Sequence, residues 1–166
     1  MKIRTDFVTN SSSSSFIIAF NNKDEGLAYF AKEIIEDDRV ERVLEDFASE
    51  EPLTKEKLHE IVEEEAKSAA CYKLCWAGSW RNPNFRDKWK EKNPGKTFME
   101  MLESEEYKRE EDKLVKEYVD KFYKDLGTNN YAVMLEYADE DGSFFSELEH
   151  EVVPNLDCTI RTFRHH

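Results

Sequence analysis

A run of five serines near the start of the chain has residue types and spacing that could support chemistry. Several hydroxyls and consecutive backbone N–H groups can together hold a phosphate or a carboxylate. The run has no glycine and no Walker lysine, so the signal for an anion site is weak. A loop over 9–15 between two strands is the favoured interpretation, because serine side chains bond to nearby backbone. The candidate ligand-binding residues in this region are Arg4, Ser11, Ser12, Ser13, Ser14 and Ser15.

Cationic residues at the other end of the chain extend this hypothesis. Arg161, Arg164 and His165 lie in the closing segment "CTIRTFRHH". If the last strand pairs near the first, they converge with Arg4 and the serine run into a positive pocket for a small anion. The same parts could serve a hydrolase or transferase acting on a phosphorylated small molecule. The chain lacks a G-x-S-x-G elbow, and a histidine at a chain end is too mobile for a precise base, which disfavours catalysis.

The cysteines and acidic clusters predict neither a metal site nor a cofactor. Cys71 and Cys75 are four residues apart and lack the second pair that a zinc ribbon needs, so they are expected to pack as small core residues. In "DEDG", an EF-hand loop with Gly142 at its sixth position would place Tyr137 and Leu148 where acids are required. A hairpin turn is the better interpretation of that segment.

Composition restricts the classes of partner. The net charge is -13, with 24 basic and 37 acidic residues among 166. Such a chain lacks the basic footprint that nucleic acids require, and it repels anionic membranes. No apolar stretch approaches a membrane span of about 18 residues, and "MKIRTDFVTN" is not a secretory signal. Three cysteines indicate reduced thiols and a cytoplasmic location.

Strand patterns at both ends and helical patterns in the middle predict an α+β fold. We expect a small, mostly antiparallel sheet of N- and C-terminal strands packed against a helical middle region, in a single domain covering 1–166. The Asp141-Gly142 pair predicts a hairpin that joins "YAVMLEY" to a second strand, "SFFSELEHEV". Asn22 with Glu25 resembles a capping box at the start of a helix, Thr97 and Glu100 form a second one, and Gly127 suits the end of the last helix. The buried face expected for that last helix carries Leu114, Val115, Tyr118, Val119, Phe122 and Tyr123. The expected strands are 2–8, 16–20, 131–137 and 158–163, and the expected helices carry 27–35, 40–47, 54–76 and 105–126.

The connection at 78–96 mixes aromatic and basic residues. Aromatic anchors that pin a long loop to the core are one interpretation. A protein-binding surface is another, since Trp and Arg are common interface anchors, whereas base stacking is disfavoured by the acidic residues nearby. The residues concerned are Trp80, Phe85, Trp89 and Phe98 with Arg81, Arg86, Lys88 and Lys90.

The opening "KIRTDFVTNSSSSSF" resembles the start of a group of uncharacterised bacterial proteins, mostly of Firmicutes, and of large-phage proteins. They begin with a basic residue or two and "FVSNSSSSSF", and here Thr9 stands where Ser is usual. The tail "EYADEDG…LEHE…IRTFRHH" resembles a pattern in some of them. That group has no known activity, so the resemblance implies a recurring serine-rich loop and supplies no chemistry.

The function we expect is a non-enzymatic cytoplasmic binding or protein-interaction protein, with a protein partner or a small anionic ligand. Two alternatives are the hydrolase or transferase above and an acidic protein that mimics nucleic acid. An interaction protein should show an exposed aromatic patch. An enzyme should show a pocket where serines 12–15 meet a histidine, and a mimic should show carboxylates spaced along one face.

Overall fold

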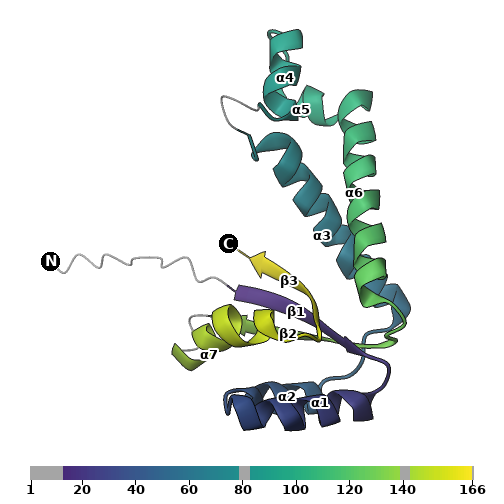
Figure 1. Cartoon of the computed structure of the whole chain (residues 1–166). Coiled ribbons are helices and arrows are strands. Elements are labelled where there is room, and N and C mark those ends of the chain that lie inside the picture. The colour runs from purple at the N-terminus through teal and green to yellow at the C-terminus, as the bar shows by residue number, and fades with distance from the viewer. Residues whose placement is uncertain (1–12, 79–82, 139–142, 166) are drawn as a thin grey trace, which may run out of the picture. The chain divides into compact units, whose positions relative to one another are not determined.

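The computed structural model describes residues 13–78, 83–138 and 143–165, with backbone only for 13 and 162–165 (Figure 1). The strand expected at 2–8 and the Asp141-Gly142 turn lie outside the described residues. The chain divides into two compact units. The two chain ends, up to Thr54 and from Leu126, form a sheet unit, and Lys55–Asp125 forms a helical unit. Whether both belong to a single domain stays a prediction.

The sheet unit confirms the predicted α+β class. Its three strands are β1 (Ser13–Phe20), β2 (Tyr131–Ala138) and β3 (Thr159–His165), in the order β2-β1-β3, and both pairings are antiparallel. Apolar and β-branched residues favour strands at these positions. The loop expected at 9–15 is wrong for residues 13–15, because these three serines pair with β2 on one side and β3 on the other.

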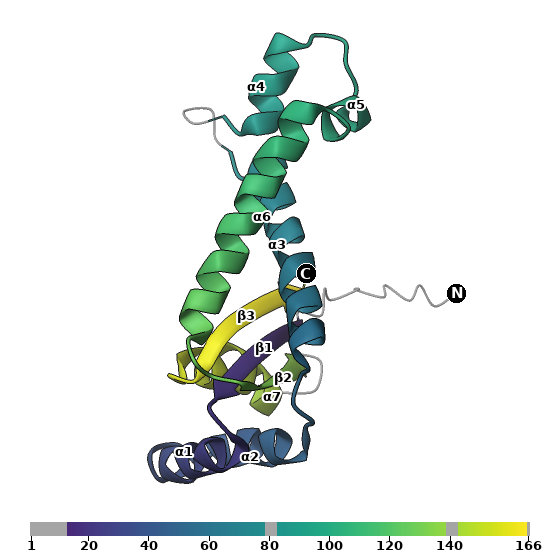
Figure 2. The same cartoon turned by 90° about the vertical axis from the view of Figure 1, so that its right-hand side faces the viewer.

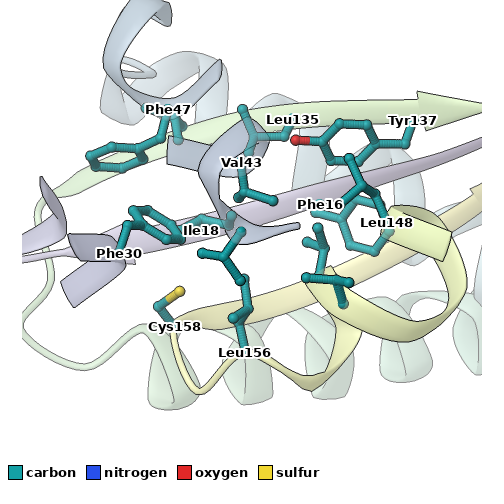
Figure 3. Close-up of a cluster of buried hydrophobic side chains, with 14 of the residues drawn as sticks. Phe16, Ile18, Phe30, Val43, Phe47, Leu135, Tyr137, Leu148, Leu156 and Cys158 are labelled. Carbon is teal, nitrogen blue, oxygen red and sulfur yellow. The ribbon is translucent and has the colours of Figure 1, made fainter. Parts of the chain in front are cut away.

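Two helices cover one face of this sheet, α1 (Lys23–Glu36) and α2 (Val40–Ser49). The Asn22 side chain caps α1 by accepting a hydrogen bond from the Glu25 N–H at 2.9 Å, as the sequence predicts. Alternate residues of β1 point to this face, so Phe16, Ile18 and Phe20 share a core with the apolar sides of both helices (Figure 3). The helix residues in that core include Phe30, Val40, Val43 and Phe47.

The predicted second strand of the hairpin is wrong. Its residues form α7 (Ser143–Glu147), a π-helix η2 (Leu148–Val152) and a 3₁₀ turn η3 (Val153–Asn155). Phe145 and Leu148 are three residues apart and both contact the core of the sheet unit, whereas a strand would place residues at that spacing on opposite faces. Arg39 holds this segment against the helices, since its guanidinium contacts Glu147 at 3.0 Å and Glu151 at 3.1 Å.

The helical unit contains α3 (Lys55–Cys75), α4 (Phe85–Lys92), α5 (Phe98–Leu102) and α6 (Glu105–Leu126, which ends one residue beyond the unit) (Figure 2). The helices α3 and α6 are antiparallel. Near the start of α3 the His59 ring is 3.1 Å from the Tyr123 hydroxyl, and near its end Cys75 shares a core with Tyr107. The α3 residues at four-residue spacing are buried: Leu58, Val62, Ala66, Ala70 and Leu74.

The predicted buried face of α6 is only partly correct. Phe122 is fully buried, but Tyr123 is exposed, and four further residues of the predicted face are half-buried: Leu114, Val115, Tyr118 and Val119. The α3–α6 seam is narrower than this apolar stripe. Gly127 has a φ of 60°, which fits the left-handed residue expected just after α6. Across the described parts of the chain, no helix is both long enough and apolar enough to cross a lipid bilayer.

Candidate functional site

The serine run lies beside the C-terminal strand, as the anion-site hypothesis required. In the β1–β3 register Ser13 is opposite His165 and Ser14 is opposite Arg164. Arg161 is opposite Ile17, next to a bulge that shifts the register before Ile18. Arg4, Ser11 and Ser12 lie outside the described residues. The strand pairing is therefore present, and the anion site itself stays a prediction.

The hydroxyls of Ser14 and Ser15 are engaged by carboxylates of the protein. Ser14 Oγ donates to Glu149 Oε1 at 2.7 Å, and Ser15 Oγ donates to Glu136 Oε1 at 3.1 Å. A serine hydroxyl has one proton to donate. These two protons are thus directed at carboxylates rather than at a bound anion. Glu149 was not a candidate in the sequence, because the hairpin prediction placed it in a strand.

Glu149 lies in η2 and its side chain is almost fully buried at 2% exposure. Its second oxygen, Oε2, has no hydrogen-bond partner among the described residues and is 3.9 Å from His150 Nε2. A nucleophilic triad places the histidine between the serine and the carboxylate. Here Ser14 and His150 each contact the carboxylate instead, so these three residues do not form such a triad.

No three His, Cys, Asp or Glu side chains among the described residues are grouped so that they could hold a metal ion. All three cysteines are free. Burial raises the pKa of Cys75 to about 11 and that of Cys158 to about 12. Their thiols are therefore protonated near neutral pH, as expected for small core residues.

A second candidate site is an exposed aromatic cluster in the helical unit. We call it the tip patch and define it by Tyr72, Trp76, Arg86, Phe98 and Met99. Tyr72, Trp76 and Met99 are 63%, 58% and 61% exposed, and Phe98 is 36% exposed. The Trp76 and Phe98 ring centres are 6.3 Å apart, and the Arg86 guanidinium carbon lies 4.7 Å from the Trp76 ring centre. The patch is therefore a set of exposed apolar side chains around one stacked cation.

The patch is exposed because of its position relative to the buried stripe of α3. Tyr72 and Trp76 come two residues after Ala70 and Leu74, which both belong to that stripe. Two residues along a helix correspond to a rotation of about 200°, so these rings point away from the core. The Trp76 N–H still donates to the Tyr72 carbonyl at 2.8 Å, which continues the helical geometry to Trp76.

Phe98 and Met99 are held by the start of α5. Thr97 and Glu100 form the predicted capping box, in which the Thr97 N–H donates to Glu100 Oε2 at 2.8 Å and the Glu100 N–H donates to Thr97 Oγ1 at 3.2 Å. Hydrogen bonds from Lys96 and then from Thr97 lower the pKa of Glu100 to about 2. The carboxylate therefore stays charged at neutral pH and keeps the capping box intact.

A compact core supports the patch. Leu74, Cys75, Trp89, Met101 and Tyr107 are buried together. The buried Asn84 side chain donates to the Cys75 carbonyl at 2.9 Å and accepts from the Asp87 N–H, so it joins the end of α3 to the start of α4. Gly78 passes close to this junction, where a Cβ would lie 2.8 Å from the Asn84 nitrogen. The close approach requires glycine.

The aromatic side chains predicted around the 78–96 connection divide into buried anchors and exposed surface residues. Trp89 is buried and Phe85 packs partly into the same core, which confirms the anchoring interpretation for these two residues. Phe98 is instead exposed, and Trp80 and Arg81 lie outside the described residues. The sequence did not single out Tyr72, Trp76 or Met99 as surface residues. The only signal was that Tyr72 and Trp76 fall outside the apolar stripe of α3.

No family model, curated protein or solved structure matches this chain. The resemblance of the N-terminus to bacterial and phage proteins thus stays an expectation. Any inference about function therefore depends on the geometry of the described residues.

Proposed function

We propose that the protein is a non-enzymatic, cytoplasmic interaction protein that binds a partner protein through the tip patch. The observation that carries this proposal is the group of four exposed apolar side chains with Arg86 stacked on Trp76. Large apolar clusters on a surface mark interaction sites, and Trp, Tyr and Arg are the residues most enriched in binding hot spots. The supporting core keeps the patch ordered before binding, which lowers the entropy cost of association.

The partner segment we propose is acidic and carries an apolar or aromatic anchor residue. The helix α4, which supplies Arg86, has four basic side chains and two acidic ones, whereas the whole chain has a net charge of -13. A local basic surface on an acidic protein attracts acidic segments and orients them during encounter. The rings of Trp76 and Phe98 provide the apolar surface on which the anchor would pack.

The two alternatives have less support from the described residues. The hydrolase or transferase needs a serine activated by a histidine, but the Ser14 hydroxyl donates to Glu149. A nucleic-acid mimic would bind through regularly spaced carboxylates, whereas the exposed cluster found here is aromatic and basic.

A peptide-display selection on the full-length protein tests the proposal. We expect enrichment of peptides that combine acidic residues with an aromatic or large aliphatic residue. A synthetic copy of an enriched peptide should shift the NMR signal of the exposed Trp76 indole and leave that of the buried Trp89 unchanged. The Trp76→Ala variant should bind it at least about 30-fold more weakly, the equivalent of a hot-spot loss of about 2 kcal/mol.

The matched control is Ile35→Ala. Ile35 is 81% exposed but lies on α1 in the sheet unit, so its loss should leave peptide affinity unchanged. Equal binding by wild type and Trp76→Ala would overturn the proposal. Single-stranded oligothymidine provides the other comparison, because a shift of the Trp76 indole with this probe alone would show that the patch stacks bases rather than binding protein.

A further inference from the structure

The outer edge of β2 belongs to the sheet unit, whereas the tip patch belongs to the helical unit. The strand order β2-β1-β3 makes β2 an edge strand. Backbone hydrogen bonds establish which of its groups point outwards. The Ala19 N–H donates to the Cys158 carbonyl, on the β3 side, and Ala19 is the register partner of Ala132. The Leu53 N–H donates to the Ala132 carbonyl at 2.8 Å, so Ala132 directs its backbone away from β1.

The same direction applies to every second residue of β2. In an antiparallel pair, residues alternate between those that bond to the partner strand and those that point away from it. Met134 and Glu136 therefore present their N–H and C=O groups at the outer edge. Leu53 covers this edge at Ala132, and no hydrogen bond within the described parts of the chain reaches the outward groups of Met134 or Glu136. Such groups form a template for a further strand.

A groove of about 530 Å³ runs along this part of the edge. One side is Met134 to Tyr137 of β2, and the other is formed by side chains of α2 and by Phe145 of α7. Tyr137 Oη donates to Asp46 Oδ2 at 3.0 Å, which joins the strand to α2 at the base of the groove. An extended peptide could thus pair with the edge and place alternate side chains in the groove.

The charges of the groove favour a basic occupant. Two carboxylates line it, those of Asp46 and Glu50, against one cation, Arg42, whereas Glu136 directs its carboxylate to Ser15 on the opposite face of the sheet. Arg42 is already paired with Asp46, with an N–O distance of 2.8 Å. Glu50 therefore leaves the groove negative, and Glu136 adds a carboxylate at the same edge on the opposite face of the sheet. Two copies of this chain docked edge to edge would bring these carboxylates together, which disfavours self-pairing.

We propose that the β2 edge binds an extended, basic segment of a partner protein as an additional strand. Main-chain hydrogen bonds to Met134 and Glu136 would supply the pairing. Lysine or arginine side chains would meet Glu50 on the groove face or Glu136 on the opposite face of the strand, and an apolar residue would pack near Phe145. This site lies in the sheet unit and the tip patch in the helical unit, so failure of one proposal leaves the other standing.

The first test uses a capped hexapeptide of alternating lysine and valine with the full-length protein. In the free protein the Met134 and Glu136 amides should exchange rapidly with solvent, and the peptide should slow their exchange by about tenfold or more. A glutamate–valine hexapeptide should have no such effect. Slow exchange of both amides without peptide would show that the edge is already covered, and would overturn the proposal.

Two controls separate strand pairing from general charge attraction. Peptides N-methylated on alternate residues lose the N–H groups of one edge only, so one of the two methylated series should lose binding and the other should keep it. Glu50→Lys should weaken the lysine–valine peptide by about threefold or more. Glu36→Lys makes the same charge change at an exposed position on α1, outside the groove, and should have little effect. Equal binding of both methylated series, or equal effects of the two charge variants, would overturn the proposal.

Discussion

The contact between Ser14 and Glu149 allows a direct test of what the serine run does. Ser14 Oγ donates to Glu149 Oε1 at 2.7 Å, and both side chains are at most 2% exposed. Ser14→Ala would leave a buried carboxylate without this donor. A hydrogen bond to a charged group contributes about 1.5–3 kcal/mol, and we expect a loss of stability in that range.

For a chain of this length, 1 kcal/mol corresponds to about 2–4 °C in Tm, so the expected decrease is about 3–12 °C. The assay should report on the sheet unit. Tryptophan fluorescence does not, because Trp76 and Trp89 belong to the helical unit and the sequence has no tryptophan outside 55–125. Hydrogen exchange of the Phe16 and Ile18 amides, measured alongside thermal unfolding, reports on β1 directly. Ser49→Ala is the matched control, because its hydroxyl also donates a hydrogen bond but at an exposed position.

A double-mutant cycle decides whether the effect passes through Glu149. In a Glu149→Leu background the buried charge is absent, so Ser14→Ala should cost less than about 0.5 kcal/mol. An unchanged Tm for Ser14→Ala, or an equal loss in both backgrounds, would refute the reasoning. The serine would then be free of a structural role, and an anion-binding role would regain support.

Two further predictions concern the cores. Gly26→Ala should destabilise the sheet unit by about 1–2 kcal/mol, because the new Cβ would lie 2.4 Å from Phe47 Cζ in a packed aromatic cluster. This cost should exceed the gain from the better helix propensity of alanine. Denaturant unfolding measures the change in stability, and a stabilised variant would contradict the prediction. Since the pKa of Cys75 is raised from 9.0 to about 11, the Cys75 thiol should react slowly with a disulfide reagent at pH 8. The stability that the protonated Cys75 thiol contributes should be full below pH 9 and should decline as the pH rises towards 11. Labelling of folded Cys75 at the rate of the unfolded chain would contradict this.

Local patterns were sufficient for most of the helices. The apolar spacing and the cap at Asn22 predicted α1 correctly, because a helix is stabilised by contacts three or four residues apart along the chain. The capping box of Thr97 and Glu100 was also correct, although the short helix α5 that follows it was not expected. The predicted end of the long helix before Gly127 was also correct, since only glycine adopts that backbone conformation without strain. The α+β class followed from the order of these elements.

The sequence by itself therefore determined the four longest helices, α1, α2, α3 and α6, together with the class of fold and the acidic charge. Tertiary structure alone decided that Ser13–Ser15 form a strand, that Glu149 is buried against Ser14, that Trp76 faces outwards, and that Met134 and Glu136 direct their backbone groups to the outer edge of β2. Each of these depends on residues far apart in the chain: Ser14 and Glu149 are separated by 135 positions. Strand register and burial are set by which elements pack together, and a local sequence pattern does not identify the distant residues with which it will pair.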